Sequence, residues 1–311
     1  MLRCFREWMK RIPGIGPFIY YFYLRLFYDK TITADATYRW ITLLRSNELL
    51  RQLALKRPSF ATKPLGDYLN MKYRFSERVH SLRSHYEFVL SRIPKNQLVS
   101  ILFEEGLVLA EFLGKSGASY RVTLGTHSAS HNEGELLLQL ENAENQIISF
   151  VIFNVGSING KPRIEVGCLQ GAVVPWESIL TKMATKDFHS TRPKHLIMAL
   201  LYELSRCWNI DSIACIKTIE QVKYNRGNNP EFYADYDRFW EELGGIPDDS
   251  GFYIMPAQLS HRDKATIRKD GAKDRRHRRR LELKNSVFAT VRTTLDYPRG
   301  ARLEVLPAAK D

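Results

Sequence analysis

The sequence predicts an α/β protein of the α+β type, in which a helical N-terminal region, residues 1–115, precedes an antiparallel sheet with helices. Residues 31–113 mix apolar and charged side chains at helical spacing, with breaks near Pro58, Pro64 and Pro94. From Tyr120 the pattern changes to short runs of β-forming residues separated by turn residues. With 311 residues, 44% of them apolar, the chain can bury one large core or two modest ones.

The first 30 residues hold six Lys or Arg and an aromatic stretch at 17–28. Arg25 and several tyrosines interrupt this stretch, which is far shorter than the roughly 20 apolar residues that span a bilayer. No small-residue cleavage site follows it. We therefore expect neither a signal peptide nor a transmembrane helix. Two interpretations stay open: a helix in the membrane interface, or a first helix whose aromatic face packs on the core.

Four runs rich in β-forming residues follow the helical region, with turn residues at 127–134, 142–145 and 156–162 between them. Runs joined by short turns pair most economically as neighbours, so we expect an antiparallel meander. The predicted strands are 120–124, 135–140, 147–153 and 163–167.

Residues 193–208 form an apolar stripe at helical spacing, with Pro193 in the first turn and Ser190 or Thr191 as N-cap. A short strand at 213–216 follows. Arg192 and Lys194, with His195, crowd the helix start, where the macrodipole disfavours cations. A phosphate-bearing ligand near 190–194 would resolve this conflict, because helix N-termini bind phosphate. The alternative is that these side chains extend into solvent.

A second helix is predicted at 233–245, capped from Asn229 and ended by two glycines. Its aromatic residues share one stripe, which predicts a core face. Asp237 and Glu241 lie off that stripe, and either is a candidate general base if the protein is an enzyme. His189, just before the proposed anion site, is the third catalytic candidate.

The net charge of +12 is concentrated at the two ends of the chain. Residues 262–284 hold eleven Lys or Arg against four Asp or Glu, whereas residues 31–261 carry 25 of each sign. A neutral body with two basic ends indicates a localised anionic partner rather than a general solubility surface. The C-terminal run is predicted to contact an anionic membrane surface, to bind nucleic acid, or to be a solvated helix. Its central arginines are Arg275, Arg276, Arg278, Arg279 and Arg280.

The stretch 229–256, together with Leu169-Gln170-Gly171 and Thr181-Lys182, resembles the VirK/YbjX family of Gram-negative bacteria. This resemblance implies a role in virulence, envelope stress or resistance to antimicrobial peptides, and a protein partner at the envelope. It brings no set of catalytic residues. The expected units are a helical region at 1–115, the family core at 116–261 and a basic segment at 262–311.

The order of a meander, a helix whose start faces a loop, and a further strand is similar to the core of the GNAT acyltransferases. In that family the helix start receives the pyrophosphate of acyl-coenzyme A. The chain lacks the family's Arg/Gln-x-x-Gly-x-Gly/Ala loop, and its nearest match is Leu169-Gln170-Gly171-Ala172. The resemblance implies acyl-coenzyme A or acyl-carrier protein as donor, bound near Gln170, Gly171, Ser190, Arg192 and Lys194.

Four scattered cysteines without a Cys-x-x-Cys pair fit a reducing, cytoplasmic setting, with peripheral contact to the inner membrane as an added expectation. His127 and His131 are four residues apart, but their serine-rich, turn-like setting does not predict a metal site.

Overall fold

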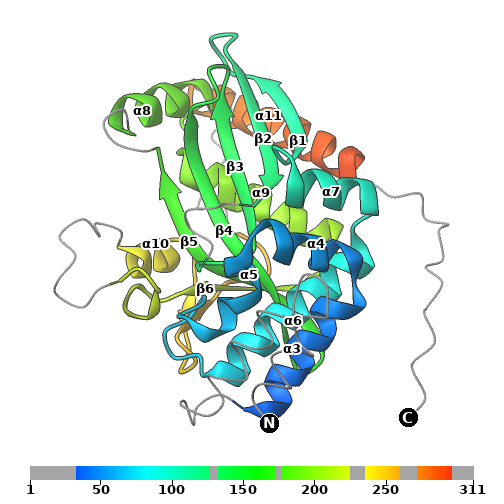
Figure 1. Ribbon diagram of the computed structural model, residues 1–311. Coiled ribbons are helices and arrows are strands. Elements are labelled where there is room, and N and C mark those ends of the chain that lie inside the picture. The colour runs from blue at the N-terminus through cyan, green and yellow to red at the C-terminus, as the bar shows by residue number, and fades with distance from the viewer. Residues whose placement is uncertain (1–32, 127–131, 173–176, 225–234, 260–271, 296–311) are drawn as a thin grey trace, which may run out of the picture.

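The computed structural model describes residues 33–126, 132–172, 177–224, 235–259 and 272–295 (Figure 1). The aromatic N-terminal stretch, the pair His127 and His131, and the cap at Asn229 lie outside these residues. No helix in the described ranges is both long and apolar enough to cross a membrane.

The first described segment is helical, as predicted, and its prolines lie at the breaks. Pro58 is the first residue of α5, Pro64 lies in the 3-10 turn η1, and Pro94 precedes α7. The side chain of Asn47 caps α4 by accepting from the amides of Leu49 and Leu50. The helices are α3 (Ala34–Ser46), α4 (Glu48–Lys56), α5 (Pro58–Thr62), η1 (Lys63–Leu65), α6 (Phe75–Arg92) and α7 (Lys95–Phe103).

The predicted helical region ends earlier than expected, because Leu107–Leu113 is strand β1. Gly106 adopts a φ of +102°, which ends the helical path after α7. A register shift between Val108 and Ala110 in the pairing of β1 with β2 breaks the alternation of buried and exposed residues. The sequence pattern of this strand therefore resembled that of a helix.

The meander is confirmed, with longer strands than predicted: β2 (Ser119–Gly125), β3 (Leu136–Asn142), β4 (Ile147–Ile158) and β5 (Lys161–Gly171). The turn predicted at 156–162 is only two residues long. Asn159 and Gly160 have φ of 50° and 75°, the conformation that favours a tight hairpin. Strands β4 and β5 consequently extend far beyond the predicted runs.

The remaining elements complete one eight-stranded mixed sheet with the order β1-β2-β3-β4-β5-β6-β8-β7. Among the described strands, β5 and β6 form the parallel pair and the other pairings are antiparallel. The predicted helix 193–208 and strand 213–216 are confirmed. The elements are α8 (Glu177–Asp187), α9 (Pro193–Cys207), β6 (Ser212–Ile216), η2 (Thr218–Glu220), α10 (Tyr236–Glu242), β7 (Ile246–Pro247), β8 (Phe252–Ile254) and α11 (Ala272–Leu295).

Two helix caps differ from the prediction. The N-cap of α9 is Arg192, without a side-chain hydrogen bond, because His189 and Ser190 form a left-handed turn with φ of 51° and 70°. The N-cap of α10 is Asp235, whose carboxylate accepts from the Arg238 amide at 3.1 Å. Both N-caps therefore lie later in the chain than the sequence pattern indicated.

Helices cover both faces of the sheet (Figure 1). Helices α3 to α7 lie on one face, and α9 and α11 on the other. Strand β4 is buried along most of its length, as expected of a strand packed on both sides. Helix α11 is anchored by Val287, Val291 and Leu295, which are buried at helical spacing. The basic C-terminal segment from Ala272 therefore continues as a helix docked on the sheet.

His85 on α6 is a buried titratable group that makes stability depend on pH. Its Nδ1 accepts from the Val155 amide at 3.1 Å, and burial lowers its pKa to about 4, with Lys63 adding to the effect and Glu135 opposing it. A lowered folded-state pKa means that the unfolded chain binds the proton more readily, so stability is lost as pH falls from about 6.5 to about 4. We expect a loss of roughly 3 kcal/mol from this group.

Urea unfolding at a series of pH values checks this expectation. In His85→Asn the amide oxygen keeps an acceptor for Val155 without a titrating ring, so the pH slope should flatten. The matched control is His80→Asn, because His80 lies on the same helix and is exposed. Equal slopes for the His85 variant and the parent would contradict the assignment.

Candidate functional site

The parallel pairing of β5 with β6 covers less than half of β5. Residues 163–166 pair with Ser212 to Cys215, whereas β5 continues to Gly171. Beyond Val166, none of the described strands pairs with β5 on that side. Strand β6 ends at Ile216, one residue after the last pair, so the rest of β5 faces the elements that follow β6, and we call the space between them the wedge.

A bulge lies where the wedge begins. In the pairing with β4, Ile152 faces Cys168 and Phe153 faces Val166, so Gly167 is the extra residue. A side chain on Gly167 would overlap the carbonyl oxygen of Glu133. Glycine is thus required because the backbone of the segment before β3 packs directly against the bulge.

Tyr236, at the first position of α10, closes the inner end of the wedge. Its hydroxyl accepts from the Leu169 amide at 3.2 Å and lies 3.5 Å from the sulfur of Cys168. The amide of Leu169 therefore points away from β4 and into the wedge. Burial raises the pKa of Tyr236 well above its usual value, so the phenol keeps its proton.

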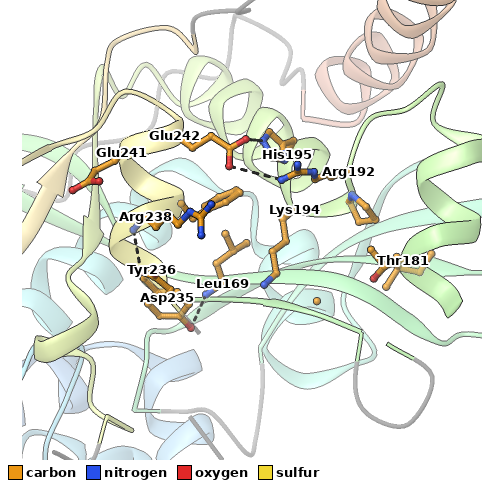
Figure 2. Close-up of a pocket in the computed structure, with 14 residues that line it drawn as sticks. Leu169, Thr181, Arg192, Lys194, His195, Asp235, Tyr236, Arg238, Glu241 and Glu242 are labelled. Atoms are coloured by element: carbon orange, nitrogen blue, oxygen red, sulfur yellow. Dashed lines mark hydrogen bonds and ion pairs between the residues drawn. The ribbon is translucent and has the colours of Figure 1, made fainter. Parts of the chain in front are cut away.

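A pocket of about 830 Å³ occupies the wedge and its mouth (Figure 2). Its walls come from β4, β5, α8, the start of α9 and α10. The side chains that carry chemistry are Thr181, Arg192, Lys194, His195, Asp235, Tyr236, Arg238, Glu241 and Glu242.

The three carboxylates of the pocket all have partners within the protein. Glu242 lies 3.8 Å from Arg192 and 3.3 Å from His195 Nε2, and so links α10 to the start of α9. Asp235 caps its own helix. Glu241 accepts from the Tyr253 hydroxyl at 3.1 Å. Glu242 therefore partly neutralises the positive charge at the start of α9, where the sequence predicted that an anion would bind.

Two pocket cations remain without such compensation. Within the described ranges, the side chains of Lys194 and Arg238 have no hydrogen bond or ion pair. Figure 2 shows Lys194 extending from α9 towards the strand that carries Leu169, and Arg238 directed into the same space from α10. The pocket therefore presents two unneutralised cations beside the first turn of a helix, which is a favourable setting for an anion.

His195 is neutral near pH 7, whereas the sequence pattern grouped it with the cations. Burial lowers its pKa, and Arg192 adds to this effect while Glu242 opposes it. The ring packs edge-on against Phe239, with centroids 5.2 Å apart. A neutral imidazole beside a carboxylate can accept a proton, so His195 is the best-placed base in the pocket.

The structure brings together some of the predicted site residues. Gly171, Arg192, Lys194 and Glu241 all line the pocket. Gln170 is outside the lining, and its carbonyl oxygen accepts from the Ser149 hydroxyl.

The other candidates lie elsewhere. Asp237 accepts from the amide and hydroxyl of Thr218, which ties α10 to η2. His189 and Ser190 line a separate basic pocket with Arg275, Arg276 and Arg279. Arg278 is exposed, and Arg280 lies 2.8 Å from His277 Nδ1.

Sequence reasoning missed Tyr236, Arg238 and Glu242 as pocket residues. Tyr236 matched a core stripe, and its burial confirms that it packs in the core, yet its hydroxyl reaches the wedge. No sequence signal could pair Tyr236 with Leu169, because the two are far apart in the chain and meet only through the order of the strands. Glu242 had such a signal, since a carboxylate was needed near the cationic start of α9.

Comparison with known proteins identifies relatives over most of the chain. The family described as "Protein of unknown function (DUF535)" matches residues 19–293. The uncharacterized protein YbjX of Escherichia coli (strain K12) is 26% identical over 254 residues, which cover 80% of this chain and 76% of that protein. An uncharacterized protein of Haemophilus influenzae is 21% identical over 181 residues, or 58% of this chain and 60% of that protein. The chain therefore belongs to the DUF535 family, and the predicted VirK/YbjX resemblance is confirmed.

Proposed function

We propose that the wedge pocket binds a phosphate-bearing acyl donor, acyl-coenzyme A or acyl-carrier protein, and that the protein is a GNAT-like acyltransferase. The observation that carries this proposal is the open edge of β5 beyond Val166, bordered by Lys194, Arg238 and the start of α9. A pantetheine arm has amides that can pair with a strand edge, as extended peptides do. Its phosphates would lie at the helix start.

The topology supports the same proposal. A meander leads through α8 and α9 to the parallel strand β6, followed by α10 and the antiparallel pair β7 and β8. The meander, the helix and the further strand are the order on which the GNAT resemblance rests.

Acyl transfer would use pocket residues in defined roles. The nucleophile of the acceptor attacks the thioester carbon, the C–S bond breaks, and the departing thiolate takes up a proton. His195 is proposed to accept the proton of the attacking group, since its imidazole is neutral. Tyr236 is proposed to donate a proton to the thiolate, since its phenol remains protonated.

Thermal unfolding in the presence of acetyl-coenzyme A tests the donor proposal. A ligand that binds only the folded protein stabilises it by about 2.7 kcal/mol at 100 times its Kd, so the midpoint should rise. The rise should disappear in the Lys194→Ala, Arg238→Ala double variant. The matched control is Lys161→Ala with Lys182→Ala, which removes two exposed lysines outside the pocket. No rise at millimolar ligand, or an equal loss in both double variants, would contradict the proposal.

A second candidate function places the protein at the bacterial envelope, on the cytoplasmic membrane surface, in virulence or stress. The exposed arginines of α11 support contact with an anionic surface. Sedimentation with vesicles containing phosphatidylglycerol tests this contact, which should weaken with salt. Replacing Arg275, Arg276, Arg278, Arg279 and Arg280 by Gln should abolish it. Binding to duplex DNA in preference to vesicles would favour the nucleic-acid alternative instead.

A further inference from the structure

A second pocket, of about 470 Å³, lies apart from the wedge and is lined mainly by cations. The lining comes from three places in the chain: the turn between β1 and β2, the end of α8 with the residues after it, and the start of α11. The residues are Lys115, Lys186, His189, Ser190, Arg275, Arg276 and Arg279. We refer to it as the basic pocket.

The turn that carries Lys115 is fixed against the end of α8. The Asp187 carboxylate accepts from the Ser116 amide at 3.1 Å, the Ser116 hydroxyl at 2.7 Å and the Tyr120 hydroxyl at 2.6 Å. The Lys115 amide donates to the Asp187 carbonyl oxygen at 3.1 Å. Lys115 therefore reaches the pocket from a turn joined to the end of α8 by three hydrogen bonds, while the bond from Tyr120 ties β2 to the same carboxylate.

The residues after α8 are also held in place. His189 and Ser190 both adopt left-handed backbone conformations, which non-glycine residues seldom do. The Ser190 amide donates to the Thr185 carbonyl oxygen at 2.8 Å, and the Thr191 amide to that of Phe188 at 3.0 Å. The compact turn places both residues in the lining of the basic pocket rather than at the start of α9.

The three arginines are carried by a docked helix. Arg275, Arg276 and Arg279 follow a spacing of i, i+1 and i+4, which puts them on one side of α11. Further along α11, the Thr294 hydroxyl donates to the Leu109 carbonyl oxygen at 3.0 Å, beside the buried anchors described above. The three arginines lie on the same continuous helix, N-terminal to these anchors.

The pocket has more positive charge than its surroundings balance. The carboxylates that raise the pKa of His189 are Glu282 and Asp187. The Asp187 carboxylate already accepts hydrogen bonds from three donors. Within the described part of the chain, the side chains of the five lining cations have no ion pair. Burial, followed by Arg279 and Lys115, lowers the pKa of His189, which is consistent with this excess of positive charge.

We propose that the basic pocket is a binding site for a phosphomonoester, either the headgroup of a lipid or a soluble phosphorylated compound. A dianionic phosphate has three acceptor oxygens, and arginine and lysine donors converge on the pocket from separate elements. The site is independent of the wedge pocket, with which it shares no lining residue.

Vesicles containing phosphatidic acid test the lipid source, and glycerol 3-phosphate, a soluble phosphomonoester, tests the soluble source. The pocket variant is Lys115→Gln with Arg279→Gln. The matched control is Lys161→Gln with Arg45→Gln, which removes the same charge from exposed positions outside the pocket and away from α11. We expect the pocket variant to bind roughly 10- to 30-fold more weakly and the control to change by less than about 3-fold, since each nearby cation contributes to anion affinity.

The outcomes separate the alternatives. Tight binding to phosphatidic acid vesicles, over phosphatidylglycerol vesicles of equal charge, identifies a lipid headgroup. Glycerol 3-phosphate binding that the pocket variant loses identifies a soluble phosphomonoester. Equal weakening in both variants, or binding that depends on vesicle charge alone, would overturn the proposal and leave a diffuse charged surface. The proposal would also be overturned if duplex DNA, at equal phosphate concentration, displaced both ligands from the control variant.

Discussion

Replacing Lys63 by Met is expected to destabilise the protein by about 3 to 5 kcal/mol. The Lys63 ammonium lies 2.5 Å from Glu135 Oε1, and the two side chains are only 6% and 4% exposed. Although burial alone would raise the pKa of Glu135, Lys63 and His85 lower it below its usual value, so the carboxylate is charged. Without Lys63 this charge stays buried beside the hydroxyl of Tyr86.

Urea unfolding at pH 7 measures the effect. The double variant Lys63→Met, Glu135→Leu should recover most of the lost stability, because removing both charges also removes the cost of burying them. The control is Arg39→Met, since the Arg39–Asp35 pair is exposed on both sides and should contribute no more than about 1 kcal/mol. A loss below 1 kcal/mol in Lys63→Met would show that the pair is not needed to compensate a buried charge.

Replacing Gly167 by Ala is expected to cost at least about 3 kcal/mol, at the upper end of overpacking effects. The added methyl group would overlap the Glu133 carbonyl oxygen, which is backbone and cannot rotate away. To accommodate it, either β5 or the segment before β3 must move. Because Gly167 is the bulge from which the wedge opens, donor binding should weaken along with stability.

Gly125→Ala is the matched control in the same sheet. A methyl group there would meet only the Gly106 α-carbon at 3.5 Å, an ordinary contact, so stability should change by less than about 0.5 kcal/mol. Chemical unfolding and calorimetry of both variants give the comparison. Equal stabilities for the two variants would mean that the close packing at the bulge is not a constraint.

The sequence predicted the fold where each segment had one clear pattern. The four meander strands have β-forming runs between turn residues, and α9 has a continuous apolar stripe, so both were placed correctly. Strand β1 was missed because the register shift after Val108 disguised its alternation. The true extent of β4 and β5 depended on how tightly Asn159 and Gly160 turn, which is a property of backbone angles.

The candidate site was predictable only where charge conflicted with local structure. The cations at the start of α9 marked one wall of the wedge pocket, since the macrodipole makes them unfavourable there. The opposite wall comes from α10, and the position of that helix depends on the parallel pairing of β5 with β6. The link between His189 and Arg279 likewise requires α11 to dock on the sheet, so the basic pocket could not be found from either segment alone.

Hydrogen exchange of the full chain with and without acetyl-coenzyme A tests the donor site most directly, because it locates the ligand as well as detecting it. The account predicts slower exchange in peptides covering 163–172 on β5 and 190–198 at the start of α9, where the open strand edge and the helix start meet. Peptides covering 112–120 and 275–283, around the basic pocket, should be unchanged. Protection absent from β5 and the start of α9 at millimolar ligand would contradict the acyl-donor account.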